Sequence, residues 1–396
     1  MYAFRPDWWD IGHVEGSRAY ITILTIRALR EYVFMSSFLK KYSHHLMDYE
    51  QLAEAMQTSL QTNLWDEQAQ YLMNWNGQQK DSHYYMGSLL APAFGLLGDM
   101  KSKQLVATAT KELVDERIGV RAAVPADFHT KEAIAFFKFA SDEAGQPYFY
   151  INGGVWQHNN AWYALALKNV GRVDDAVRFV KSTMTLDGIA RSPNGIPAMY
   201  EYRYSNAASP DFGKIDKPSF LWAGGFYLYT LYHLFGVNED EWNISLSGPL
   251  PSLNDSIRYT LTLGNSKEVS VRGNGNRLKS LTMDGKELSS LVLPAKSEKA
   301  RSIDVTFGNS GTPYLVRINA ILHGVSLTKN ILTADISSFE GHGVTAEIVA
   351  PTLCKRVLFG GKRITNVTVK AEADGLRLVQ IHVAGTAQQQ KLNVIF

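Results

Sequence analysis

The sequence predicts an α+β multidomain chain, in which a helical part is followed by a part built from β-strands. Three observations predict it. Helix-length apolar segments dominate residues 1–238. These segments alternate between helices that are apolar on all sides and helices with one apolar stripe. Residues 239–396 instead show short runs with strand periodicity, separated by glycine-containing turns. We therefore expect a partial (α/α)6 toroid in residues 1–238 and an antiparallel β-sandwich in residues 239–396.

The toroid is expected to contain about seven helices of two kinds. A helix that is apolar all round belongs inside, and a helix with one stripe covers it from outside, so their alternation predicts concentric rings of helical hairpins. The helices expected inside are 19–39, 84–97, 155–168 and 218–235. Those expected outside are 47–63, 101–115 and 173–185.

The connections between these helices differ in length in a regular way. Links from an inner to an outer helix are short, whereas the links 64–83, 116–154 and 186–217 are long, and each of these leads into an inner helix. Long connections tend to carry function, so we expect the site at the end of the toroid where they gather. The stretch "DWWD" (7–10) precedes an inner helix and is expected at the same end.

The number of helices indicates an incomplete ring. A closed double ring of six hairpins has about twelve helices, and a set that ends on an inner helix matches the last seven. We therefore expect that about five helices which precede this stretch in a complete toroid are missing; the alternative is a smaller open array that is complete. An open ring is expected to expose an apolar edge on helix 19–39 and to favour a partner chain or self-association that completes it.

Residues 239–396 are expected to form a packing domain, because they contain no obvious group of paired carboxylates or histidines. Turn signals at 283–285 and 359–362 separate the runs. The expected strands include 257–263, 268–273, 301–308, 363–372 and 376–385.

Composition excludes several classes of function. Lys and Arg total 40 against 38 Asp and Glu, which gives no electrostatic case for a nucleic-acid partner or an anionic membrane. No apolar run is long enough to span a membrane, and the start lacks the pattern of a signal peptide, so a cytoplasmic location fits. A single cysteine, Cys354, leaves no disulfide framework. The scattered histidines give no metal site, and no motif calls for a cofactor.

Paired carboxyl groups are the chemistry that this sequence offers. A glycosidic bond is cleaved between one acid, at the leaving oxygen, and one base that activates water. Spacing alone does not choose among the carboxylates expected at the long-loop end. They are Asp7, Asp10, Glu15, Asp66, Glu67, Asp81, Asp127, Glu201 and Asp211.

Two of these stretches have the surroundings that an acid and a base need. Asp7 and Asp10 flank two tryptophans, and a carboxyl group beside an indole loses hydration, which raises its pKa and suits an acid. Glu201 lies between two tyrosines with Arg203 beside it, and a neighbouring cation keeps a carboxylate ionised, as a base must be. A third stretch, 150–167, is dense in aromatic and polar residues that could reach sugar hydroxyls or an anion.

Three motifs resemble those of the six-hairpin glycosidases with an (α/α)6 barrel. "DWWD" (7–10) is similar to the D-W-N-D motif of the cellobiose phosphorylase family, whose second Asp is the general acid. "NGGVWQH" (152–158) looks like the stretch in which that family's histidine helps to bind phosphate. "MYEYRY" with "SFLW" (199–222) resembles the segment that carries the base of processing α-glucosidase and mannosylglycerate hydrolase.

The resemblance implies a glycoside hydrolase with an inverting mechanism. It makes Asp10 the acid and Glu201 the base, which in such a mechanism lie roughly 6.5–9.5 Å apart. The substrate is a carbohydrate. The side chains expected to bind it are Asp7, Trp8, Trp9, Trp156, His158, Asn159, Tyr202 and Arg203.

Two other functions stay open. The first is an inverting disaccharide phosphorylase with His158 at the phosphate; Ala223 speaks against it, because the family tends to carry a hydroxyl residue there. The second is a truncated, non-catalytic subunit that binds carbohydrate or completes an assembly.

Overall fold

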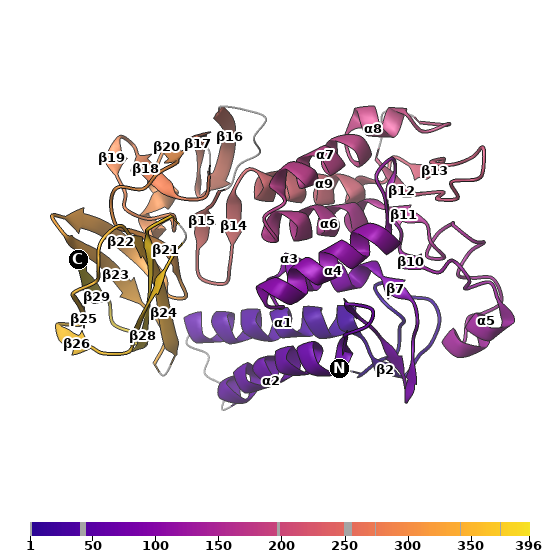
Figure 1. Cartoon of the computed structure of the whole chain (residues 1–396), viewed down its shortest axis with the longest axis horizontal. Helices are drawn as coiled ribbons and strands as arrows, with labels where there is room; N and C mark the ends of the chain where they lie inside the picture. Colours follow the sequence, from indigo (N-terminus) through magenta and orange to yellow (C-terminus); the bar gives the residue numbers. More distant parts are fainter. Residues whose placement is uncertain are drawn as a thin grey trace. The chain divides into compact units, whose positions relative to one another are not determined.

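The chain forms two compact units in a computed structural model that describes residues 2–39, 45–195, 199–248, 256–273, 275–340, 342–372 and 374–396. Among these residues, 2–33 and 45–234 make up the first unit, and 34–39 and 235–396 make up the second. Helices dominate the first unit and strands the second (Figure 1). The predicted mixture of helix and strand is therefore confirmed, whereas the partial toroid stays a prediction.

Most of the expected helices are present at nearly the expected positions. Helix α6 is the most buried of them, and it packs against α3, α7 and α9. The α-helices in the described residues are α1 (Ala19–Phe38), α2 (Leu46–Ser59), α3 (Leu90–Ala93), α4 (Asp99–Glu112), α5 (Lys131–Phe137), α6 (Gln157–Asn169), α7 (Val173–Thr183), α8 (Leu186–Ala190) and α9 (Leu221–Leu234). A π-helical turn, Leu60–Leu64, follows α2 directly.

The expected inner helix 84–97 is wrong. The structure has only a 3-10 turn at Met86–Leu89 and the single turn α3. Gly95 stops the helix with a φ of 66°, and the N–H of Leu96 donates to the carbonyl of Ala91 at 2.9 Å. This pairing closes the helix in the manner of a Schellman motif, which the glycine makes accessible.

The three long connections are folded segments. Two short helices that were not expected, α5 and α8, lie within them. The strand pairs of the first unit are β1 (Tyr2–Ala3) with β2 (Gly16–Ser17), β3 (Trp65–Asp66) with β4 (Tyr71–Leu72), β5 (Trp75–Asn76) with β6 (Gln79–Lys80), β7 (Tyr84–Tyr85) with β10 (Ala123–Val124), and β8 (Val114–Asp115) with β9 (Gly119–Val120). Strands β11 (Val155–Trp156), β12 (Tyr200–Arg203) and β13 (Ile215–Pro218) form a three-stranded sheet.

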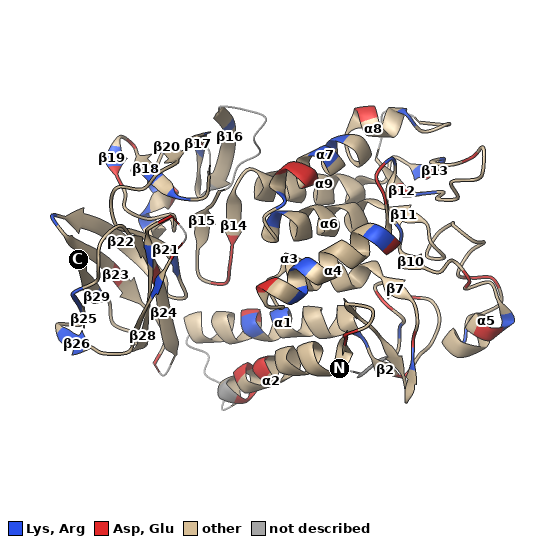
Figure 2. Cartoon of the chain, viewed as in Figure 1, with Lys and Arg blue, Asp and Glu red and all other residues tan. Residues whose placement is uncertain are grey.

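Two helices of apolar sequence leave large side chains exposed. On α9, Leu221 is 85% and Leu228 is 58% exposed, and Figure 2 shows no charged residue along this helix. On α1, Tyr32 is 45% and Met35 is 51% exposed. An open edge on helix 19–39 and a partner that covers it stay predictions.

Within the described residues, the second unit contains three larger sheets and a two-stranded sheet around one apolar core. Their strand orders are β16-β17-β20-β18-β19, β21-β24-β28-β27 and β22-β23-β29-β25-β26, and β14 pairs with β15. The bounds are β14 Val237–Glu239, β15 Ile244–Leu246, β16 Ser256–Leu263, β17 Asn265–Gly273, β18 Leu278–Met283, β19 Lys286–Glu287, β20 Ser302–Phe307, β21 Tyr314–Ile318, β22 Ile321–Thr328, β23 Ile331–Ser337, β24 Gly343–Ala350, β25 Arg356–Phe359, β26 Lys362–Ile364, β27 Val367–Ala371, β28 Arg377–Ala384 and β29 Gln390–Ile395. A 3-10 turn spans Ala295–Lys299.

Two details differ from the expected antiparallel sandwich. Strands β17 and β20 run parallel, with Val269 opposite Ile303, because the hairpin β18-β19 lies between them in the chain and lets β20 return in the same direction. The expected strand 363–372 is two strands in different sheets, β26 and β27, since the N–H of Val367 turns back to the carbonyl of Thr365 at 2.9 Å. A two-layer sandwich stays a prediction.

The second unit also takes in a segment from far earlier in the chain. The ring of Phe34 packs 5.1 Å from that of Trp242 and 6.0 Å from that of Phe339. These aromatic contacts explain why residues 34–39 cluster with the strands of this unit. No helix in the described parts of the chain has the length and apolar character needed to cross a membrane.

Candidate active site

The loop with the "DWWD" stretch is anchored on both sides of its tryptophans. The guanidinium of Arg5 donates to the carbonyl of Gly12 at 2.5 Å, and the N–H of His13 donates to the carbonyl of Phe137 at 2.6 Å. Trp9 is 3% exposed and belongs to the core, whereas Asp10, the next residue, is exposed. The loop therefore presents the carboxylate of Asp10 to solvent from a fixed base.

Strand β12 carries the second candidate carboxylate, Glu201. Its partner cation is Lys217, whose Nζ lies 2.7 Å from Glu201 Oε2, and only 13% of the Glu201 side chain is exposed. The sequence suggested Arg203 for this role, but the buried guanidinium of Arg203 donates to the carbonyl of Gly188 at 2.9 Å instead. Glu201 is thus paired across the β12-β13 hairpin.

Aromatic rings link the two stretches. The ring of Trp156 lies 4.7 Å from that of Trp8 and 5.4 Å from that of Tyr202, which pairs with Trp156 in the β11-β12 register. Tyr150 adds a ring 5.8 Å from Tyr202. We call this group the aromatic cluster; its members are Trp8, Tyr150, Trp156, His158, Tyr202 and Trp222.

The charges of both candidate carboxylates affect the pKa of one phenol in this cluster, that of Tyr150. Burial raises the pKa of Tyr150, and the negative charges of Asp10 and then Glu201 raise it further. Asp10 and Glu201, which are far apart in sequence, therefore both lie within electrostatic range of Tyr150. Close packing holds Tyr150 there: a Cβ on Gly154 would meet the carbonyl oxygen of Tyr150 at 2.4 Å.

His158 is part of the wall of the cluster. Its ring lies 4.3 Å from Trp8 and 4.6 Å from Trp222 and is 3% exposed. Burial lowers its pKa to about 3, so the imidazole is neutral at neutral pH. Within the described residues neither ring nitrogen has a hydrogen-bond partner. The neighbouring Asn159 is tied through its Nδ2 to the carbonyl of Val120 at 3.0 Å.

Asp7 lies in the protein interior, unlike Asp10. It is 2% exposed, and its Oδ2 accepts from the N–H of Gly87 at 3.3 Å. A side chain at position 87 would collide with this carboxyl, because a Cβ there would meet Asp7 Oδ1 at 2.2 Å. Burial raises the pKa of Asp7 to about 8, and the Gly87 hydrogen bond and Arg18 offset only part of this rise. Asp7 is therefore protonated at neutral pH.

This buried acid predicts a pH-dependent stability. The unfolded chain releases the Asp7 proton near its ordinary pKa of 3.8 and the folded chain keeps it up to about 8, so the free energy of unfolding falls as pH rises between these values. The slope from this one group reaches about 1.4 kcal/mol per pH unit. Asp7→Asn should remove this group's contribution to the slope, which urea unfolding of both proteins across this range would measure. Parallel curves for the two proteins would contradict the prediction.

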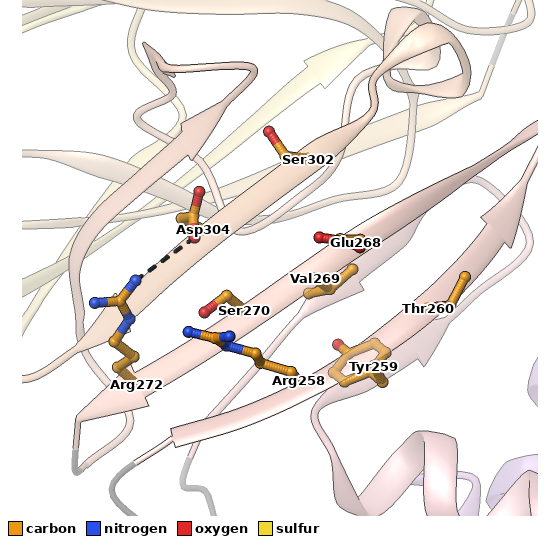
Figure 3. A pocket seen from close by; sticks show the side chains of 9 residues that line it. All are labelled: Arg258, Tyr259, Thr260, Glu268, Val269, Ser270, Arg272, Ser302 and Asp304. Atoms are coloured by element: carbon orange, nitrogen blue, oxygen red, sulfur yellow. Dashed lines mark ion pairs between the residues drawn. The ribbon is translucent and has the colours of Figure 1, made fainter.

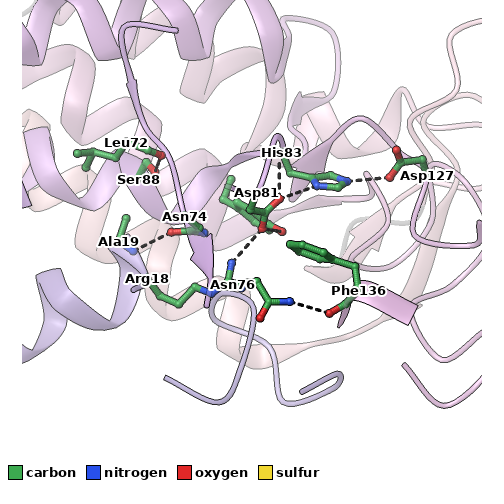
Figure 4. A network of polar contacts seen from close by, with 11 residues as sticks. Arg18, Ala19, Leu72, Asn74, Asn76, Asp81, His83, Ser88, Asp127 and Phe136 are labelled. Carbon is green, nitrogen blue, oxygen red and sulfur yellow. Dashed lines mark hydrogen bonds and ion pairs between the residues drawn. The ribbon is translucent and has the colours of Figure 1, made fainter. Parts of the chain in front are cut away.

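Arg18 and Asp81, whose charges act on Asp7, belong to a polar network that Figure 4 shows. Arg18 Nη1 donates to Asp81 Oδ2 at 2.9 Å, Asp81 Oδ1 lies 2.8 Å from His83 Nδ1, and His83 Nε2 lies 2.7 Å from Asp127 Oδ1. Tyr85 donates to Asp81 Oδ2 at 2.8 Å. We call these five residues the His83 network.

Charge alternates along the His83 network. Burial lowers the pKa of His83, but the hydrogen bonds that its ring donates to Asp127 and Asp81 outweigh it and raise the pKa to about 9. Burial likewise works against the charge of Asp81, and His83, Arg18 and Tyr85 together hold its pKa below the ordinary value. At neutral pH the network therefore holds two cations and two carboxylates in alternation.

Sequence reasoning missed several residues of this region. Tyr150 and Trp222 stood within quoted motifs but were given no role, and the histidines were judged too scattered to act together. A signal for the network existed: Asp81, His83 and Tyr85 alternate at a spacing of two, which places them on one side of an extended segment. Their partners Arg18 and Asp127 are distant in sequence and could be found only in the fold.

A separate polar hollow of about 490 Å³ lies in the second unit (Figure 3). Strands β16, β17 and β20 line it with Arg258, Glu268, Arg272 and Asp304, and Arg272 and Asp304 form an ion pair at 3.8 Å. None of the predicted site residues lines it. Among the residues that the structure describes, no group of three or more His, Cys, Asp or Glu side chains could hold a metal ion.

The known proteins that this chain resembles are carbohydrate-active enzymes. Residues 12–204 match the family model described as amylo-alpha-1,6-glucosidase. An N,N'-diacetylchitobiose phosphorylase from Vibrio proteolyticus is 21% identical over 326 residues, covering 77% of this chain and 39% of that protein. The chain thus spans well under half the length of this curated relative.

Solved structures of glycosidases resemble part of the chain. The GH63 mannosylglycerate hydrolase from Thermus thermophilus in complex with glucose has 16% identity and a TM-score of 0.40, covering 55% of this chain and 48% of its own. Neutral trehalase from Saccharomyces cerevisiae has 14% identity and a TM-score of 0.36, covering 54% and 36%. The family match over residues 12–204 agrees with the resemblance of the helical part to the six-hairpin glycosidases.

Proposed function

We propose that this chain carries the acid and base of an inverting glycoside hydrolase. Asp10 protonates the glycosidic oxygen of the leaving group, and Glu201 takes a proton from the water that attacks the opposite face of the sugar. The observation that carries this proposal is that packed rings connect the two stretches: Trp156 lies 4.7 Å from Trp8, on the Asp10 loop, and 5.4 Å from Tyr202, the residue after Glu201.

The surroundings of each carboxylate support its role. Lys217, 2.7 Å from Glu201, stabilises the ionised form that a base requires. Asp10 is exposed at the edge of a loop whose tryptophans are fixed, so a bulky leaving group could reach it. The partly exposed rings of Trp8 and Tyr202 offer apolar faces on which the C–H groups of a sugar could stack, whereas Trp156, expected to bind sugar, is 3% exposed and packs behind them.

The runner-up function is phosphorolysis. The relative from Vibrio proteolyticus is named as a phosphorylase. Two features of this chain favour hydrolysis instead: Ala223 offers no hydroxyl to phosphate, and the buried, neutral His158 offers no positive charge. A phosphorylase also needs no base, because phosphate itself attacks the sugar, so Glu201 discriminates the two reactions.

The test is turnover of a panel of α- and β-linked disaccharides, including N,N'-diacetylchitobiose, with and without inorganic phosphate. We expect the wild type to act without phosphate and Glu201→Gln to lower kcat about 100- to 10,000-fold, since the base is lost. Glu67→Gln, a change at an exposed carboxylate outside the cluster, should leave kcat unchanged. The anomer first released, read by NMR, should be opposite to that of the substrate.

The other outcomes separate the alternatives. Turnover only with phosphate, retained in Glu201→Gln, would replace the hydrolase by the phosphorylase. Sugar binding without turnover of any substrate would favour the non-catalytic subunit, whose exposed α9 face would then bind the partner chain that completes the ring.

A further inference from the structure

The carboxylate of Asp127 is held at the surface by one oxygen only. Its Oδ1 lies 2.7 Å from Nε2 of the buried His83, and 41% of the side chain is exposed. Its other oxygen, Oδ2, has no hydrogen-bond partner among the residues that the structure describes. Asp127 thus combines a fixed position with a free acceptor oxygen.

The His83 network, which holds Asp127 in place, contains buried charges that packing alone does not require. The side chains of Arg18 and Asp81, at the buried end of the His83 network, are 0% and 1% exposed. Taking such charges out of water is costly, and apolar residues of similar volume are often equally stabilising or better. A buried alternation of charges that ends in one exposed carboxylate is therefore typical of a group whose position matters for binding.

The backbone around Asp127 is part of the same region as the candidate active site. The N–H of Phe128 donates to Asn152 Oδ1 at 3.1 Å, which joins this loop to the loop that carries Tyr150. The ring of Phe128 also lies 6.0 Å from that of Trp9, the residue before Asp10. Asp127 is therefore flanked by both loops that build the site.

We propose that Asp127 is a sugar-binding residue, whose free Oδ2 accepts a hydrogen bond from a ring hydroxyl of a pyranose. His83 is a positioning residue, because it acts only by holding the other oxygen. The inference rests on the proposed function in taking the ligand to be a carbohydrate, and it adds a contact that the acid and base do not provide. Carboxylate acceptors make hydrogen bonds about twice as strong as neutral ones, which suits recognition of one hydroxyl.

Binding of glucose, mannose and N-acetylglucosamine, followed by tryptophan fluorescence, tests this inference. Asp127→Asn retains an oxygen to accept from His83 and puts a donating NH2 where Oδ2 was. We expect it to raise the Kd of the sugar that binds best about 10- to 100-fold. Asp211→Asn, at a carboxylate that is 58% exposed on another long connection, should leave the Kd unchanged.

Monodeoxy forms of the same sugar identify the hydroxyl. One monodeoxy sugar should bind the wild type about 10- to 100-fold more weakly than the parent sugar does. That deoxy sugar and the parent sugar should bind Asp127→Asn equally well, because the variant and the deoxy sugar each remove the same hydrogen bond. The thermal unfolding midpoint of Asp127→Asn, compared with that of the wild type, shows that both measurements are made on folded protein.

Three results would overturn the inference: an unchanged Kd in Asp127→Asn, additive losses for every deoxy sugar, or no binding of any of the three sugars to the wild type. These results are distinct from a failure of the proposed function. Loss of turnover in Glu201→Gln together with an unchanged Kd in Asp127→Asn would leave the hydrolase standing and remove Asp127. Sugar binding that depends on Asp127, without turnover of any substrate, would keep Asp127 as a sugar-binding residue and remove the hydrolase.

Discussion

Asp10→Asn is expected to lower kcat on an unactivated disaccharide about 100- to 10,000-fold, because the leaving oxygen then departs without a proton. The amide has nearly the shape of the carboxyl group, and the exposed position of Asp10 makes the loss one of chemistry and not of folding. KM should change far less than kcat, since proton donation is needed only in the transition state.

The identity of the acid is tested by the leaving group. A dinitrophenyl glycoside of the same sugar leaves with little need of protonation, so Asp10→Asn should cleave it nearly as fast as the wild type does. Asp211→Asn should behave as the wild type on both substrates. An equal loss of rate on both substrates would show that Asp10 has another role and would remove it as the acid.

Arg18→Met should destabilise the protein by about 3–5 kcal/mol, because it leaves the buried carboxylate of Asp81 without the cation that faces it at 2.9 Å. The same change at Arg117, in an ion pair with Asp115 at 2.7 Å whose arginine is 61% exposed, should cost less than about 1 kcal/mol. Both values follow from urea unfolding at neutral pH.

A second change separates lost charge from lost volume. If the cost arises from the unpaired carboxylate, adding Asp81→Asn to Arg18→Met should recover part of the stability, since an amide carries no charge to leave unpaired. Strictly additive losses in the double variant, or equal losses at Arg18 and Arg117, would mean that the His83 network does not depend on this ion pair.

The helices could be predicted from the sequence where periodicity extends over several turns. Helices α1, α4, α6, α7 and α9 lie close to their expected bounds for this reason. The short helices α5 and α8 were missed because they depend on a single cap: Thr130 accepts from the N–H of Ala133 at 3.2 Å, and Thr185 accepts from that of Gly188 at 3.3 Å. A cap of this kind in a polar connection resembles an ordinary turn in sequence.

Pairings between distant residues could not be predicted from periodicity. Nothing in the runs of β17 and β20 indicates that they lie side by side and parallel, since that register depends on how the intervening hairpin folds. The same limit applies to the site. The sequence pointed to the stretches of Asp10 and Glu201, but the pairing of Glu201 with Lys217 and the link from His83 to Asp127 depend on tertiary contacts.

The contact of Phe34 with Trp242 and Phe339 has a consequence for how the chain acquires its structure. A ribosome releases Phe34 long before the strands that it packs against, so this part of the second unit can form only after most of the chain has been made. Contacts of such large sequence separation slow folding and leave apolar groups exposed in the meantime. Phe34 and its neighbours are therefore where a newly made chain would first need the protection of a chaperone.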